Sequence, residues 1–239
     1  MGNSREGILN GFDLKLIAAA LMVLDHVLEY FPSAPIWFGY LGRIVAPIFF
    51  YLTVEGFFHT RSRVNYMARL FLGAAVMYVG SRILTHFMPT PVGIPNNIFV
   101  SLGLGVALMS AFEWTRETGK YWTGIPMIIA IAAVSLSTEA SLYGVAMISV
   151  FYFFRNNTKM MAIMYIATSL MISWPSPALN KTHILLYDYQ WMMVFATPFF
   201  FLYNGKRGPG GEAAKWFFYI FYPAHLWIIY VIQYFTFWV

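Results

Sequence analysis

Residues 14–28 read LKLIAAALMVLDHVL, a hydrophobic segment that holds three ionisable residues, Lys15, Asp25 and His26. Eleven residues make about three helical turns, so Lys15 and His26 share one face of a helix, roughly 16 Å apart along its axis. Ionisable side chains are costly inside a membrane helix and usually face a polar interior. The segment therefore predicts a functional site at membrane depth.

The composition is that of a membrane protein. Of the 239 residues, 59% are hydrophobic and only 10% are charged, and the mean hydropathy is +0.62. Soluble domains carry about 25% charged residues, so we expect an all-α, polytopic transmembrane bundle rather than a soluble enzyme. The chain has no cysteine, which excludes disulfides, a thiol nucleophile and a cysteine-bound metal. We expect one transmembrane domain over residues 1–239 and no metal.

Nine hydrophobic segments approach the length of about 20 residues that a membrane-spanning helix needs. The fifth and sixth are short and separated only by residues 137–140. This part of the chain is therefore either two spans or one re-entrant hairpin. The nine segments cover residues 14–31, 41–58, 65–86, 97–113, 122–137, 140–154, 159–174, 185–203 and 214–237.

Positive charges alternate between the connections and set the orientation. Cytoplasmic loops are enriched in Lys and Arg, which places the N-terminus inside and the C-terminus outside. Residues 1–12 are then a short cytoplasmic tail, and we expect a multi-pass protein of the cell (cytoplasmic or inner) membrane. The net charge of +5 follows from this orientation and from contact with anionic membrane lipids, so we expect no nucleic acid partner. The inner basic residues are Arg5, Lys15, Arg61, Arg63, Arg116, Lys120, Arg155, Lys159, Lys206, Arg207 and Lys215.

The polar residues of the first two segments suggest acid–base chemistry. Asp25 and His26 are adjacent and point in different directions, whereas Glu29 follows His26 by three residues and can reach it on the same helix. Arg43, near the outer end of the second segment, is a candidate cation for a developing negative charge. Two other interpretations stay open: Arg43 pairs with Asp25 only structurally, and the whole set is a satisfied polar cluster that ties helices together.

Basic residues also gather where an anion would meet the inner surface. Arg69 lies several residues inside a hydrophobic segment, where the positive-inside pattern does not require a basic residue. Glycines flank Lys206 and Arg207. Arginine suits the recognition of phosphate, although the positive-inside pattern alone explains most of these residues. Glu55 and His59 are spaced to pair on one helix face.

The last segment contains a second polar group. Tyr222 and His225 flank Pro223, and a helix interrupted by proline is tolerated in a membrane where it lines a cavity. His225 is therefore either a functional group of the bundle interior or a core histidine bonded to a neighbour.

Several motifs together resemble the TraX family, which is named for the conjugative F-pilin acetylase and belongs with broader integral-membrane acyltransferases. In those enzymes the first helix carries a basic residue, ten intervening residues and a histidine, a spacing that Lys15 and His26 fit. The pieces that carry the resemblance span almost the whole chain in the expected order. They are Asp13–His26, Gly42-Arg43 with Pro47-Ile48-Phe49, Asn97-Ile98-Phe99, Tyr143-Gly144 and Tyr222-Pro223-Ala224-His225-Leu226.

The resemblance implies acetyl transfer from cytosolic acetyl-CoA to an acceptor at or across the membrane. His26 would act as general base, oriented by Asp25 or Glu29, with Arg43 stabilising the oxyanion. The acceptor would be an amine, on a peptide N-terminus or an amino sugar, in preference to a hydroxyl. The stretch Glu55-Gly56 with His59-Thr60-Arg61 resembles TraX relatives outside conjugation systems more than the pilin enzyme. Residues expected to bind acetyl-CoA are Lys15, Glu55, His59, Arg61, Arg63, Arg69, Lys206 and Arg207.

Two other classes fit parts of the pattern. A proton-coupled transporter also places Asp, Glu and His inside the membrane, but the chain lacks repeat symmetry and clusters its arginines on one side. A scaffold without catalytic activity would tolerate loss of His26.

Overall fold

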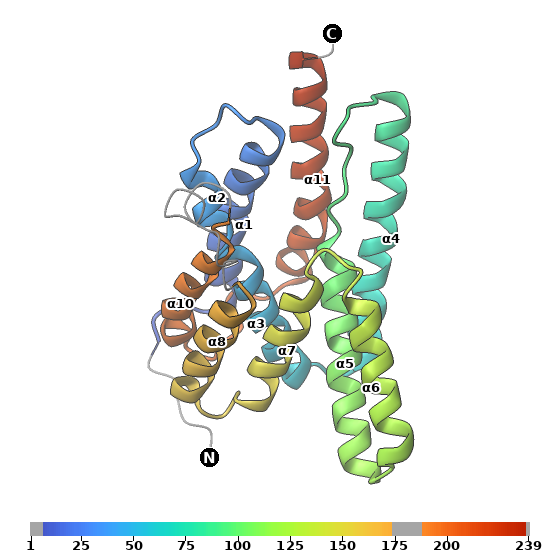
Figure 1. Ribbon diagram of the computed structural model, residues 1–239, viewed down its shortest axis with the longest axis vertical. Helices are drawn as coiled ribbons and strands as arrows, with labels where there is room; N and C mark the ends of the chain where they lie inside the picture. The colour runs from blue at the N-terminus through green and yellow to red at the C-terminus, as the bar shows by residue number, and fades with distance from the viewer. Residues whose placement is uncertain (1–6, 174–187, 238–239) are drawn as a thin grey trace.

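The computed structural model describes residues 7–173 and 188–237, and in that part the secondary structure is helical apart from one bridge between Leu9 and Tyr203 (Figure 1). Each of the nine predicted segments corresponds to a helix or a pair of consecutive helices, so the predicted helical bundle is confirmed. Residues 174 and 185–187 of two predicted segments lie outside the described residues. The elements are α1 (Gly11–Tyr30), α2 (Trp37–Gly42), α3 (Val45–His59), α4 (Arg63–Phe87), α5 (Ile98–Thr118), α6 (Tyr121–Ser135), α7 (Ser141–Phe153), α8 (Thr158–Ile172), the 3₁₀ helix η1 (Gln190–Ala196), α10 (Thr197–Leu202) and α11 (Glu212–Phe237).

The helices differ in length. Four stretches of the described residues are long and apolar enough to cross a membrane: Trp37–His59, Arg63–Phe87, Ile98–Thr118 and Trp216–Phe237. Helices α6, α7 and α8 are shorter, and a 15-residue helix is about 22 Å long, less than the ~30 Å of a bilayer core. The turn between α6 and α7 lies well below the upper ends of α4 and α11 (Figure 1). These short helices therefore end part-way along the long ones.

Helix α1 lies at the centre of the contacts that build the site. It packs against α2, α3 and α11, while α4 packs against α5 and α11. Helix α11 continues through Pro223, so the expected interruption of this helix at the proline is wrong.

The start of α1 is clamped by the loop that precedes α11. Asn10 caps the helix, since its side-chain oxygen accepts from the N–H groups of Phe12 and Asp13, and the Asp13 carboxylate accepts from the Asn10 N–H. The Gly11 N–H donates to the carbonyl oxygen of Lys206, and the Phe12 N–H is shared between Asn10 and the carbonyl oxygen of Arg207. Satisfying the free donors of a helix start stabilises it. The same bonds hold the basic loop beside the first turn of α1.

Two buried carboxylates pair with basic residues at the start of α4 and just after α7. Glu55 of α3 binds Arg155, whose Nε lies 3.0 Å from Oε1, and Glu113 of α5 binds Arg63. Both carboxylates are almost completely buried, and burying a charge requires such a partner. These pairs hold α3, α4, α5 and the end of α7 together.

The orientation of the bundle can be tested directly. Because the basic connections should stay in the cytoplasm, alkaline phosphatase fused after Val239 should be active in cells, and the same enzyme fused after Asn157 should be inactive. The reverse pattern would contradict the orientation.

Candidate functional site

A cavity of about 430 Å³ opens between α1, α3, α4, α5 and α11. This is within the usual size range of small-molecule sites. Three cations line it: Lys15 from α1, Arg69 from α4 and Arg207 from the loop before α11. Much of the remaining wall is aromatic, and the ammonium of Lys15 lies 5.5 Å from the ring centre of Phe218. The cavity can therefore hold a long ligand that carries negative charge and apolar parts.

Arg69 brings a buried hydrogen-bond donor to the cavity. Its Nε atom is buried and has no hydrogen-bond partner within the described ranges. Its guanidinium carbon lies 5.9 Å from the ring centre of Tyr66, which also lines the cavity. A buried donor without a partner is costly, and a phosphate oxygen would satisfy it.

Not every residue expected to bind acetyl-CoA reaches the cavity. Lys15, Glu55, His59, Arg69 and Arg207 line it, whereas Arg61, Arg63 and Lys206 are not among the described lining residues.

The expected pairing of the Glu55 and His59 side chains is wrong. His59 Nδ1 lies 2.7 Å from the backbone carbonyl oxygen of Glu55, and the Glu55 carboxylate binds Arg155. Sequence reasoning gave Arg155 no role beyond orientation, because a basic residue in an inner connection is unremarkable.

A buried pair of histidines lies next to the cavity. Met22, one turn before His26, and Tyr222, one turn before His225, both line the cavity. The side chains of His26 and His225 are 5% and 7% exposed, and a hydrogen bond of 2.8 Å joins Nδ1 of His26 to Nε2 of His225. The two rings stack with centres 5.0 Å apart. The sequence identified both residues but not the contact between them.

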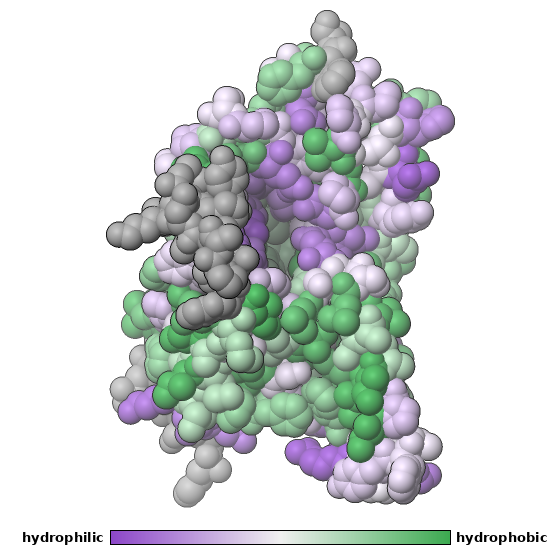
Figure 2. Space-filling model, in the orientation of Figure 1, coloured by the Kyte–Doolittle hydropathy of each residue, from purple (hydrophilic) through white to green (hydrophobic). Residues whose placement is uncertain are grey.

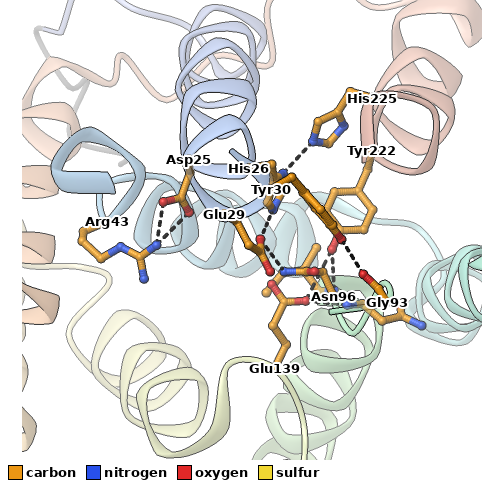
Figure 3. A network of polar contacts seen from close by, with 12 residues as sticks. Asp25, His26, Glu29, Tyr30, Arg43, Gly93, Asn96, Glu139, Tyr222 and His225 are labelled. Carbon is orange, nitrogen blue, oxygen red and sulfur yellow. Dashed lines mark hydrogen bonds and ion pairs between the residues drawn. The ribbon is translucent and has the colours of Figure 1, made fainter. Parts of the chain in front are cut away.

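The carboxylates around His26 divide into two groups (Figure 3). Asp25 binds Arg43, with Nη2 2.7 Å from both carboxylate oxygens, so the structural interpretation of this pair is supported. Arg43 also donates to Gln190 over 2.9 Å. Glu29 is the carboxylate that approaches the histidine: its Oε2 lies 3.9 Å from Nε2 of His26. The expectation that Asp25 orients His26 is not supported by this arrangement.

Two further polar residues, Asn96 and Glu139, complete the outer side of the site. Asn96 donates to the Glu29 carboxylate over 3.3 Å. Glu139, in the turn between α6 and α7, accepts from the Asn97 N–H and, at 3.4 Å, from the Tyr222 hydroxyl. Both residues lie outside the expected spans or in a turn, so sequence spacing gave no signal for them.

The two sides of the histidine pair differ in charge. Asp25 pairs with Arg43, whereas Glu29 and Glu139 pair with no Lys or Arg in the described part of the chain. Desolvation raises the pKa of Glu139 to about 7, and the nearby Glu29 carboxylate adds to this shift. Figure 2 shows a hollow in the upper half of this face, bordered by hydrophilic side chains, above a hydrophobic belt.

The fold and the site together define a helical membrane protein with a cavity lined by three cations and, beside it, a buried histidine pair. The family model described as TraX protein matches residues 11–233, and the chain belongs to this family. It is also 28% identical over 244 residues to a probable fimbrial assembly protein, FimC of serogroup H1, from Dichelobacter nodosus, an alignment that covers 93% of this chain and 95% of the relative. No solved structure matches the chain significantly.

Close packing between α1 and α2 gives a first prediction for the site. A Cβ atom on Gly42 would lie 2.2 Å from Cγ of Asp25, which Arg43 holds in place. Gly42→Ala should therefore destabilise the protein by roughly 1–3 kcal/mol, as overpacking usually does. The matched control is Gly211→Ala, because no atom lies within 4 Å of the added carbon. Equal melting temperatures of the two variants in detergent would contradict the prediction.

Proposed function

We propose that the protein is an integral-membrane acetyltransferase that moves an acetyl group from cytosolic acetyl-CoA to an amine acceptor. The observation that carries this proposal is a cavity lined by three cations, with the buried base His26 one helical turn beyond the lining residue Met22. Membership of the TraX family supports it, since the resemblance of the motifs to the F-pilin acetylase implies the same chemistry.

The cavity suits the donor in both charge and shape. The phosphates of acetyl-CoA would bind Arg69 and Arg207 near the inner opening, with Lys15 beside them. The pantetheine arm would extend along the face of α1 that joins Lys15 to His26, about three turns or roughly 16 Å. Arg61 and Lys206, outside the cavity lining, would contribute only long-range attraction, and Arg63 is committed to Glu113.

The acceptor would reach His26 from the side of Glu29. His26 Nε2 would take a proton from the acceptor amine as its nitrogen attacks the thioester carbonyl. The C–N bond forms, the C–S bond breaks, and the leaving thiolate takes up the proton that His26 holds. Glu29, 3.9 Å from Nε2, would stabilise the positive charge on His26 during the transfer.

Arg43 fits the oxyanion role expected for it less well. Its guanidinium is bonded to Asp25 and Gln190, and it would have to leave these partners to reach the thioester. We assign it the role of fixing Asp25 and the α1–α2 junction. A hydroxyl acceptor, or a covalent acetyl-histidine intermediate, would use the same atoms of His26.

Loss of the base should abolish most of the turnover. His26→Gln should lower acetyl transfer by about 10²–10⁴-fold, the usual contribution of a general base, and should leave acetyl-CoA binding intact. Acetyl transfer is measured with membranes that contain the protein, as the incorporation of labelled acetyl groups from acetyl-CoA into cell-envelope material. Normal turnover by His26→Gln would exclude this role, and solute flux independent of acetyl-CoA would favour a proton-coupled transporter.

Loss of a cavity cation should weaken donor binding instead. Arg69→Gln should raise the dissociation constant of acetyl-CoA about tenfold, which corresponds to ~1.4 kcal/mol, with desulfo-CoA as a competing ligand. The control is Lys120→Gln, because Lys120 is an exposed cation on the same expected side and is not among the described lining residues. Calorimetry on detergent-purified protein measures the dissociation constant of acetyl-CoA for both variants. Equal effects of the two substitutions would contradict a specific phosphate site.

A further inference from the structure

We propose that His225 is a positioning residue that fixes which ring nitrogen of His26 carries the proton, so that Nε2 of His26 is held as the free base. The catalytic consequence of this inference rests on the proposed function. The assignment of the protons rests only on the hydrogen bonds.

The direction of the hydrogen bonds follows from a fixed acceptor at one end. Nδ1 of His225 lies 2.8 Å from the backbone carbonyl oxygen of Phe221. A carbonyl oxygen only accepts, so Nδ1 of His225 must carry a proton. A neutral imidazole has one N–H, which leaves Nε2 of His225 as an acceptor. This nitrogen is 2.8 Å from Nδ1 of His26, so Nδ1 of His26 is the donor.

The neutral state of the pair follows from its surroundings. Both rings are more than nine-tenths buried, and burial in a medium of low dielectric disfavours the charged form. Besides His26, the ring of His225 packs against the rings of Phe221 and Tyr222, with centres 4.9 Å and 5.8 Å away, and neither offers it a negative charge. The nearest carboxylate of this pair, Glu29, faces His26.

The consequence is a specific tautomer of His26. With the proton held on Nδ1, the lone pair is on Nε2, the atom that faces Glu29 and the outer side of the site. Free histidine in water favours the opposite tautomer, with the proton on Nε2. In that tautomer Nε2 has no free lone pair and cannot act as the base. The hydrogen bond at one ring nitrogen sets the state of the other, and here His225 provides that bond.

The pair also limits the reaction to a single proton transfer. When Nε2 of His26 takes up a proton, Nδ1 keeps its own and continues to donate to His225. No proton needs to pass to His225, whose Nδ1 keeps its proton and continues to donate to the Phe221 carbonyl oxygen. The positive charge of His26 is then stabilised by the Glu29 carboxylate on one side and by the hydrogen bond to the neutral ring of His225 on the other.

Two substitutions of His225 separate positioning from packing. His225→Phe keeps a planar ring beside Phe221 but removes the acceptor, and His225→Gln places an amide oxygen where Nε2 lies. We expect acetyl transfer to fall by about 10²-fold in His225→Phe, with acetyl-CoA affinity unchanged within twofold. His225→Gln should recover activity to within about tenfold of the original protein. Equal losses in both variants would overturn the positioning role.

The ¹⁵N chemical shifts of His26 read the tautomer without any assay of activity. In histidine-labelled protein, Nδ1 of His26 should be protonated and Nε2 unprotonated, and His225→Phe should shift the proton to Nε2 in the absence of ligand. The signals are assigned with the His26→Gln variant. A proton on Nε2 of His26 in the original protein would overturn the proposal. The predicted tautomer in a protein that neither binds acetyl-CoA nor transfers acetyl groups would support the positioning role of His225 and contradict the proposed function.

Discussion

The structure depends on the need to satisfy the polar groups of α1 inside an apolar bundle. Water cannot serve as a partner there, so an unpaired polar group costs several kcal/mol. Two of these groups find partners on other elements: His26 bonds to His225 of α11, and Asp25 bonds to Arg43 beside α2. These contacts fix α1 against its neighbours, and the cavity lies along the same helix.

The charges are distributed unequally around the histidine pair. Lys15, Arg69 and Arg207 line the cavity on one side, and Glu29 and Glu139 lie on the other. A phosphate-bearing donor and an amine acceptor would each meet charge of the opposite sign, which favours their approach. This separation suits a reaction in which donor and acceptor arrive from different compartments better than it suits a single transport path.

Much of the fold was predictable from the sequence, and less of the site. Hydrophobic segments of near-span length predicted the helices, because the bilayer imposes that length. The same reasoning identified His26 and His225 but not their contact, since 199 residues separate them and helix order alone does not fix which helices touch. Glu139 was missed because it lies in a turn, and a single carboxylate there carries no spacing signal. Arg63 was predicted as a ligand residue, whereas the structure commits it to Glu113, because the positive-inside pattern does not separate structural from binding cations.

The most direct test of the account asks whether acetyl-CoA fills the cavity as far as His26. The chain has no cysteine, so a single one can be introduced by Met22→Cys, in the cavity wall one turn from His26, and by Thr118→Cys on an exposed helix end as the control. Saturating acetyl-CoA should slow methanethiosulfonate labelling of Met22→Cys at least tenfold and leave labelling of Thr118→Cys unchanged. Equal labelling rates of Met22→Cys with and without acetyl-CoA would contradict the placement of the donor in this cavity.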